Sequence, residues 1–514
     1  MCANKEVMTT LFRETWNFTG SIVSDSGAID MIANGQNNTG AVHGHRYTDS
    51  TVAAVALALE AGCDVEYDTV YASSAQAAVD QGLIAEATLA AAVRRSLSTR
   101  MRLGVFDIPQ VSPWSKIDVS VVGSAEHRAL AWQAAAASAV LLENAGDGRG
   151  LPIRSGGGPE ETIVVLGAWA TASLVGRADY TGTTSHTVSL LQGIQSRAAS
   201  DGMLVKYSSA DTSIAVKASA VVVVVQSEEE GESHDRQNLT MRSEDASTLS
   251  TLQEMKERKQ LSDTCKVIVI VVSGGPVDTS QPAAAMSHEG VVTSVIAGWQ
   301  LGEEGGNAIA ALLFGDVDFS AALAVTVYRQ NFTTAVDIAN ISLAGRGYRY
   351  LADDSLQLYP FGHGLSFNTW APPALAWSGA GAGAATTRGE LWLPTSDIGR
   401  ISVTATVRNT GSQVGSRPVL LFAQLLSATA ADAPKTWPHK WLVAFDKAMD
   451  VEPGAEKLLA LAFGAPELSR WLGGDSSTPS SGGRFAVIAG RYLLTLIDQR
   501  GEEAANLTLT VGNR

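Results

Sequence analysis

Three near-continuous aliphatic runs constrain the fold of this chain more than any other feature. They span residues 162–167, 220–225 and 267–272 and consist largely of valine and isoleucine. Strands that are buried on both faces of a parallel sheet are apolar throughout, whereas strands with one face in solvent alternate apolar and polar residues. Stretches with helical spacing separate the runs, as crossovers between parallel strands require. The sequence therefore predicts an α/β sandwich built on a parallel sheet.

The part of the chain before these runs shows the pattern strand, helix, strand, helix. Residues 18–25 are typical of a short buried strand that ends in an acid, Asp25. Apolar residues recur at helical spacing over 51–61 and 86–103, with a Gly-Cys-Asp turn at 62–64 between them. Because α/β barrels carry their chemistry at the carboxyl ends of strands, Asp25 is a candidate catalytic residue. Taken alone, Ser-Asp is a common helix N-cap or turn.

The segments that follow predict further domains. A helix is expected over 125–142, and apolar or alternating runs separated by Gly/Pro turns at 401–407, 418–424, 456–463 and 491–497 are typical of an antiparallel β-sandwich. The predicted scheme is a first domain at 1–107, a proline-containing linker at 108–124, the α/β sandwich at 125–335, a linker with a Gly/Ala-rich stretch at 336–398, and a β-domain at 399–514.

Charge and composition exclude several classes of function. The net charge is −15 over 514 residues, and no basic cluster is visible that would bind nucleic acid. The three cysteines have no metal-ligand spacing. No apolar run approaches the roughly 18 residues of a membrane span, and the start of this chain lacks a signal-peptide pattern. We expect no nucleic-acid partner, no membrane partner and no metal, while six Asn-x-Ser/Thr sequons point weakly to a secreted glycoprotein.

A series of short motifs surrounds Asp25 and continues along the chain. It begins with Cys2-Ala3-Asn4-Lys5, Leu11-Phe12-Arg13, Trp16-Asn17-Phe18, Gly20 and Val23-Ser24-Asp25. The most specific later motif is Tyr-Pro-Phe-Gly-His-Gly-Leu-Ser-Phe at 359–367, in which His363 is expected to be a packed structural residue. Together these motifs resemble glycoside hydrolase family 3. The resemblance implies that 1–107 is the C-terminal remnant of a (β/α)8 catalytic barrel and that 399–514 is a fibronectin type III-like domain.

The resemblance also implies two catalytic carboxylates. The family's nucleophile block closes with an aspartate that corresponds to Asp25, and Ser26 matches the small residue that xylosidase-like members carry next to it. The acidic loop after residue 225 is similar to the family loop that ends in Asp-Arg-x-x-Leu, and its spacing selects Glu232 as the general acid/base, with Glu230 as the alternative. Clustered glutamates raise one another's pKa, as a general acid needs. By composition alone, this loop is an exposed acidic turn.

The expected function is that of a retaining exo-β-glycosidase of the β-xylosidase or β-glucosidase kind. It would act on oligo- or polysaccharides without a cofactor, and the parent protein would be extracellular or in the cell wall. In the family most of the barrel precedes the nucleophile, so we expect impaired activity from this chain alone. The alternatives are a non-catalytic remnant or carbohydrate-binding protein and a nucleotide-binding α/β protein. The last lacks a Gly-rich phosphate loop. The sequence does not indicate an oligomeric state.

Overall fold

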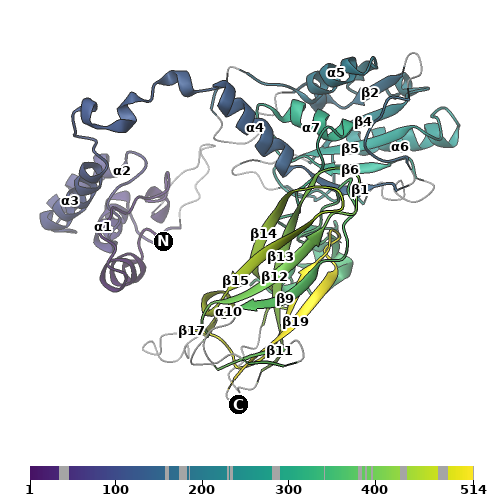
Figure 1. Ribbon diagram of the computed structural model, residues 1–514. Coiled ribbons are helices and arrows are strands. Elements are labelled where there is room, and N and C mark those ends of the chain that lie inside the picture. The colour runs from purple at the N-terminus through teal and green to yellow at the C-terminus, as the bar shows by residue number, and fades with distance from the viewer. Residues whose placement is uncertain are drawn as a thin grey trace. The chain divides into compact units, whose positions relative to one another are not determined.

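The computed structural model describes residues 1–33, 45–146, 148–156, 161–172, 182–184, 186–227, 231, 236–280, 290–337, 339–340, 342–379, 385–387, 390–394, 398–428, 437–472 and 484–512. The chain divides into two compact units, Met1–Val121 and Val122–Arg514 (Figure 1). Each unit has hydrophobic cores of its own, because the buried clusters of the described residues each fall within one unit.

Helices make up most of the first unit. They are η1 (Glu6–Thr15, a π-helix), η2 (Asp30–Ile32), α1 (Thr51–Ala61), α2 (Val70–Asp80) and α3 (Glu86–Arg102), followed by the 3-10 turns η3 (Pro109–Val111), η4 (Pro113–Lys116) and η5 (Val119–Val121). The Ser50 side chain caps α1 by accepting the Ala53 N–H, and Gly62 ends it with a left-handed φ of 103°. The helices predicted at 51–61 and 86–103 are confirmed. We missed α2, whose apolar positions are mostly alanine.

The strand predicted at 18–25 is present as an isolated bridge. Val23 pairs in parallel with Val65, and the Ser24 N–H donates to the Val65 carbonyl at 2.8 Å. A strand can form ladder hydrogen bonds only where its partner runs alongside it. The partner segment turns toward α2 soon after Val65, so the pairing stops there. Val23 is also 54% exposed. The prediction of a regular buried strand was therefore wrong, although the parallel pairing itself is that of an α/β unit.

A mostly parallel sheet organises the second unit, in the order β1-β6-β5-β4-β2-β3. Its strands are β1 (Val140–Asn144), β2 (Thr162–Leu166), β3 (Leu204–Ser208), β4 (Ala220–Gln226), β5 (Lys266–Val272) and β6 (Ser294–Ala297). Neighbouring strands are parallel except β1 and β6, which are antiparallel. The aliphatic runs are thus confirmed as the strands β2, β4 and β5, which lie side by side.

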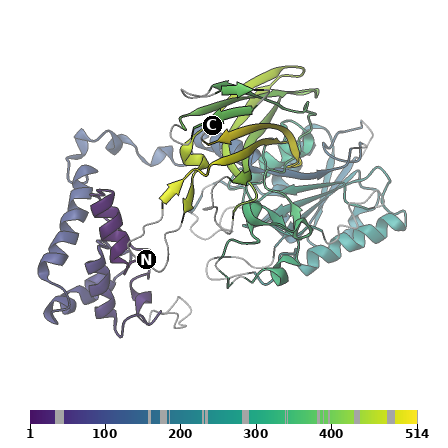
Figure 2. The same ribbon diagram turned by 90° about the horizontal axis from the view of Figure 1, so that it is seen from below.

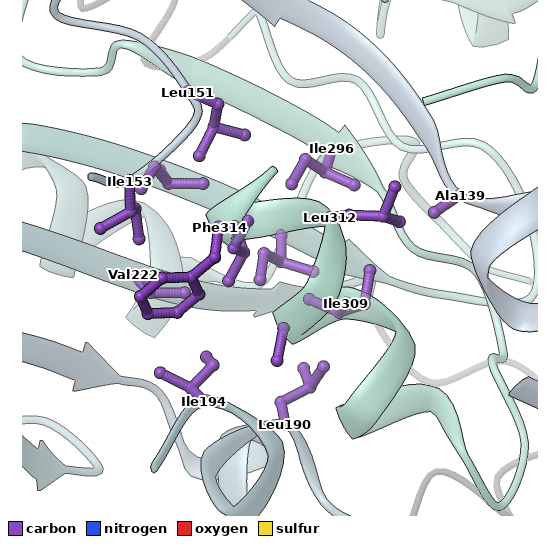
Figure 3. Close-up of a cluster of buried hydrophobic side chains, with 14 of the residues drawn as sticks. Ala139, Leu151, Ile153, Leu190, Ile194, Val222, Ile296, Ile309, Leu312 and Phe314 are labelled. Atoms are coloured by element: carbon purple, nitrogen blue, oxygen red, sulfur yellow. The ribbon is translucent and has the colours of Figure 1, made fainter. Parts of the chain in front are cut away.

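Both faces of this sheet are buried, as unbroken aliphatic runs predict. Consecutive residues of β4 enter opposite cores, with Val222 in one and Val223 in the other. Helices α5 (Leu190–Ser200) and α7 (Gly305–Phe314) supply the first core, and α6 (Ser243–Glu257) supplies the second. Figure 3 shows the first core, in which aliphatic side chains of the sheet meet those of the helices. Because each buried aliphatic side chain contributes about 1.5–3 kcal/mol, this double core contributes strongly to the stability of the unit.

Helix α4 (Ala125–Ser138) is shorter than the helix predicted over 125–142. Its last predicted turn instead forms β1, in which Leu141 and Leu142 enter opposite cores. Alternate burial on two faces suits a strand, and the alanine-rich helical pattern before it hid the boundary. The unit also contains η6 (Ala168–Thr171), η7 (Thr212–Ala215), β7 (Val327–Tyr328), α8 (Phe332–Ala335), α9 (Gly347–Tyr350), η9 (Asp354–Leu356) and β8 (Gln357–Tyr359).

The C-terminal part of the second unit consists mainly of strands, drawn green to yellow in Figure 2. One sheet has the order β10-β11-β19-β18-β13-β14 and another the order β15-β12-β9. The elements are β9 (Ala374–Gly379), β10 (Ala385–Thr387), β11 (Glu390–Leu393), β12 (Ile401–Arg408), β13 (Gly415–Ala428), β14 (Trp441–Val451), β15 (Glu456–Phe463), α10 (Ala465–Leu468), β16 (Arg470–Leu472), β17 (Arg484–Ala486), β18 (Gly490–Ile497) and β19 (Glu503–Val511).

These two sheets share one hydrophobic core, which includes Trp441 and Tyr492. The four runs predicted as strands are confirmed as β12, β13, β15 and β18. Strands β9 and β11 lie inside the segment 336–398 that we predicted to be a linker, and they pair with β12 and β19. The Gly/Ala-rich surroundings hid them, because such residues carry little strand propensity. Residues 380–384 of that stretch lie outside the described residues.

Candidate active site

Asp25 lies in the first unit, directly after the segment that pairs with Val65. Its side chain is exposed, and its carboxylate accepts the Ser26 N–H at 2.8 Å. The Asp25 carbonyl accepts the Ala28 N–H at 3.2 Å, and Gly27 has a φ of 68°, so a tight turn begins at the acid. The turn orients the carboxylate with its own backbone and leaves it open to solvent. This geometry suits a group that must reach an incoming substrate.

Ser24 locks the same turn from its buried side. Its hydroxyl donates to the Asp25 carbonyl at 2.9 Å and accepts the Tyr67 N–H at 3.2 Å. Ser24 is 6% exposed, whereas Ser26 on the other side of the acid is exposed. The structure therefore places Asp25 and Ser26 together on an accessible turn whose base is fixed.

Asp64 is a buried carboxylate whose role the sequence did not reveal. Its side chain is fully buried, and it forms ion pairs with Arg13 at 2.6 Å and with Arg95 at 2.7 Å. It also accepts the Ile22 N–H at 3.0 Å. Asp64 thereby joins η1, α3 and the segment that leads to Asp25. The available signal was an acid inside an apolar stretch, since a buried carboxylate needs charged partners.

The second predicted carboxylate belongs to a loop whose stem is described and whose tip is not. Glu232 and the alternative Glu230 lie outside the described residues, so the two candidate acids are not brought together here. The stem is closed by a bridge between Ser227 and Met241. Arg242 ties both sides together, because its N–H donates to the Gln226 carbonyl at 3.0 Å and its Nε donates to the Ser227 carbonyl at 3.1 Å.

Asp245, at the start of α6, holds one end of the stem of the acidic loop in place. Its buried carboxylate accepts the Gln226 N–H at 2.9 Å. Burial raises the pKa of Asp245 to about 6, and the hydrogen bond from Gln226 opposes that rise. The carboxylate is therefore neutralised at a much higher pH than an exposed aspartate.

Replacing Asp245 with asparagine should stabilise the protein at pH 7.5. A folded-state pKa of about 6, above the ordinary 3.8, means that the folded state binds more protons between these values, so stability is lost as pH rises toward 6. Asparagine keeps an acceptor for Gln226 and removes this loss. We expect a gain of about 1–2 kcal/mol in the free energy of unfolding at pH 7.5 and none near pH 4. Denaturant unfolding at both pH values measures it, with the exposed Asp263→Asn as control. A less stable variant at pH 7.5 would contradict the assignment.

Two further polar groups of the second unit are structural. The Nε2 of His363 lies 2.8 Å from the Leu142 carbonyl, and the ring stacks on Tyr359 at 5.0 Å. Asp318 accepts the Phe367 N–H at 2.7 Å and the Asn368 side chain at 2.8 Å. These contacts fasten the 359–367 motif to the sheet, in agreement with the packed role predicted for His363.

The described residues contain neither a candidate metal site nor a candidate membrane span. Among those residues no group of three or more His, Cys, Asp or Glu side chains could hold a metal ion. No described helix is both long enough and apolar enough to span a bilayer.

The sequence matches one family in both units. Residues 1–99 match the glycosyl hydrolase family 3 N-terminal domain, and residues 139–367 match the glycosyl hydrolase family 3 C-terminal domain. The chain belongs to glycoside hydrolase family 3. In the family match, the first segment contains Asp25 and the second contains the acidic loop, so both predicted sites fall in matched regions.

Curated family 3 relatives align along nearly the whole chain. The exo-1,4-β-xylosidase xlnD of Aspergillus oryzae is 28% identical over 535 residues, which cover 99% of this chain and 62% of the relative. A probable β-D-xylosidase 7 of Arabidopsis thaliana is 27% identical and covers 82% of this chain and 56% of the relative. The chain thus spans about 62% of the length of the first curated relatives that it matches.

Solved family 3 structures share the fold. A GH3 exo-β-xylosidase (XlnD) in complex with a xylobiose aziridine activity-based probe superposes with a TM-score of 0.81 at 22% identity, covering 100% of this chain and 64% of that one. A β-glucosidase from Listeria innocua in complex with isofagomine superposes with a TM-score of 0.75 at 20% identity and covers 100% and 66%. At these identities the likeness concerns the α/β architecture rather than the substrate.

Proposed function

We propose that this chain carries the two catalytic carboxylates of a retaining exo-β-glycosidase of the β-xylosidase kind. The observation that carries the proposal is the position of Asp25, an exposed acid on a fixed turn, inside a segment that matches the family 3 N-terminal domain. Asp25 attacks the anomeric carbon of the terminal sugar. Glu232 protonates the leaving oxygen and then activates water, with Glu230 as the alternative acid/base.

This chemistry needs the two carboxyl groups about 5–5.5 Å apart across the glycosidic bond. The described stem of the acidic loop supports such a role, because Arg242 and Asp245 fix both of its ends. Ser26 leaves room beside Asp25 for the ring of a pentose, which carries no hydroxymethyl group. The chemistry requires neither a metal nor an organic cofactor.

We also propose a finer description of the fold and of the place where the protein works. In this proposal residues 1–107 belong to a (β/α)8 catalytic barrel, residues 125–335 form the α/β sandwich domain and residues 399–514 form a fibronectin type III-like domain. The substrates are oligo- or polysaccharides such as xylan, and the parent protein works outside the cell or in the cell wall. This chain spans 62% of the length of the Aspergillus oryzae xylosidase, and in this proposal the 514 residues by themselves turn over substrate poorly, because the segment that they do not span would contribute to binding the sugar.

A covalent probe tests the proposal directly. A xylose-configured aziridine reacts with the nucleophile of a retaining glycosidase and stays attached to it. We expect mass spectrometry of a digest to place the label on Asp25, in this chain or in the same chain preceded by the barrel segment of its relatives. Glu232→Gln should then slow hydrolysis of xylobiose, and azide should restore turnover of nitrophenyl β-xyloside, which needs no acid. Glu230→Gln is the matched variant.

The outcomes are distinct. A label on another carboxylate refutes the assignment of Asp25, and azide rescue of Glu230→Gln instead of Glu232→Gln exchanges the two glutamates. A chain that binds xylo-oligosaccharides but is never labelled is the non-catalytic carbohydrate-binding protein of the alternative hypothesis.

A further inference from the structure

A large cavity lies in the second unit, and neither Asp25 nor Ser26 is among the residues that line it. Its volume is about 950 Å³, which is enough for several sugar rings. Four segments form its walls: residues at the end of β1 and after it, residues 365–373 before β9, residues before and in β13 that include Arg417, and residues from the end of β18 to the start of β19. Both polar and apolar side chains line the cavity, as is typical of a ligand-binding site.

Arg417 of β13 is a buried charge in the wall of this cavity. The residue is 5% exposed, and among the described residues its guanidinium makes a single long hydrogen bond, from Nη2 to the Ile497 carbonyl at 3.4 Å. Burial lowers the pKa of Arg417, and the nearby charge of Asp498 opposes that shift. A guanidinium carries five N–H donors, and a buried charge without acceptors is costly. Arg417 therefore has donors to offer to an anionic group in the cavity.

Two more arginines line the same cavity. Arg154 and Arg500 are exposed, and neither has an ion-pair or side-chain hydrogen-bond partner among the described residues. The opposing carboxylates are Asp498 and Glu503. One oxygen of Asp498 already accepts the N–H groups of Arg500 at 2.7 Å and Glu502 at 3.0 Å. The three arginines outnumber the two carboxylates, so the lining of the cavity has a positive net charge. The whole chain, by contrast, has a net charge of −15.

Trp370 provides an apolar wall beside these arginines. It lines the cavity together with Pro372, and it is half-buried against the core of the C-terminal sheets. Its indole Nε1 is buried and has no acceptor among the described residues, so the ring is held by packing. Indole rings stack on the apolar faces of sugar rings, and guanidinium groups pair with carboxylates through two parallel hydrogen bonds.

We propose that this cavity binds an oligosaccharide that carries a carboxylate, that is, a chain with a uronate residue. A sugar ring packs on Trp370, and the carboxylate pairs with Arg417 and with Arg154 or Arg500. The choice of a saccharide rests on the proposed function, whereas the choice of an acidic one rests on the three arginines. The cavity would hold a decorated polysaccharide at a place that does not contain Asp25.

Calorimetry on the full 514-residue chain tests this proposal. The probes are xylotriose with one glucuronate branch, neutral xylotriose and inorganic sulfate. We expect the acidic tetrasaccharide to bind at least about tenfold more tightly than neutral xylotriose, and more weakly as salt rises. The double variant Arg154→Ala/Arg500→Ala should lose about tenfold or more of this affinity. The control Arg258→Ala/Arg408→Ala removes the same charge from exposed sites of the second unit and should leave it unchanged. Because both arginines of the test variant are exposed, its folding is not at risk.

Three results would overturn the site. They are equal affinity for the neutral trisaccharide, equal affinity for sulfate, and an affinity that the double variant preserves. Prior labelling with the aziridine separates this site from the catalytic one: a labelled chain should still bind the acidic tetrasaccharide, and loss of binding on labelling would place that ligand at the catalytic centre. Failure of Asp25 to take the label leaves this binding measurement intact, so the two proposals fail separately.

Discussion

Asp25→Asn should abolish glycoside hydrolysis. Asparagine has nearly the same shape and can still accept the Ser26 N–H, but it cannot form the covalent glycosyl intermediate. We expect kcat for nitrophenyl β-xyloside to fall by at least about a thousandfold, while the affinity for a non-hydrolysed inhibitor changes little. Steady-state kinetics on whichever form of the protein turns over substrate, this chain or the chain preceded by the barrel segment of its relatives, measures the loss.

The matched control is Asp80→Asn. Asp80 is an exposed aspartate at the end of α2 that accepts a hydrogen bond from Gln76 at 2.8 Å, so its replacement removes one carboxylate from the same unit without touching the turn. It should keep wild-type turnover. An Asp25→Asn variant that retains more than about a tenth of the wild-type kcat would exclude Asp25 as the nucleophile. This conclusion does not depend on which glutamate of the acidic loop is the acid/base.

Asp64→Ala should strongly destabilise the first unit. The substitution leaves Arg13 and Arg95, whose side chains are 13% and 28% exposed, without their carboxylate. Removing one partner of a buried ion pair costs about 3–5 kcal/mol, because the remaining charge stays desolvated. The Ile22 N–H also loses its acceptor next to the segment that leads to Asp25. Hydrogen exchange of residues 1–121 and denaturant unfolding should both report the loss.

Comparison variants separate the charge from the packing. Asp64→Asn keeps an acceptor for Ile22 and should recover part of the stability. Glu254→Gln breaks the exposed pair with Arg258 on α6 and should cost less than about 0.5 kcal/mol. If Asp64→Ala costs no more than Glu254→Gln, the two arginines do not depend on Asp64 and the first unit is held by its apolar core alone.

The pattern of the sequence predicted the elements that depend on local composition. Strands β2, β4 and β5 are recognisable because residues on both faces of a buried strand must be apolar, and α1 because apolar residues recur at helical spacing before the turn at Gly62. The errors came where a neighbour decides the outcome. The segment at 18–25 pairs only through an isolated bridge, since its partner at Val65 turns away.

In the candidate site, too, some residues could be predicted from the sequence and others could not. The sequence supplied the candidates Asp25, Ser26 and Glu232 of the acidic loop, because these candidates lie in short motifs that follow one another along the chain. It did not supply the supports of that site, such as Asp64 or Asp245. These act through contacts with residues distant in the sequence, as when Asp64 meets Arg13 across about fifty positions, and no local pattern encodes such a contact.

The sequence alone therefore determined the family and the buried sheet and supplied the candidate reactive groups, since each depends on consecutive residues. Only the tertiary structure decided which polar groups are buried together and which remain without partners. The unused donors of Arg417 beside Trp370 are the clearest case, because burial and hydrogen-bond partners are properties of the folded surroundings rather than of the residue.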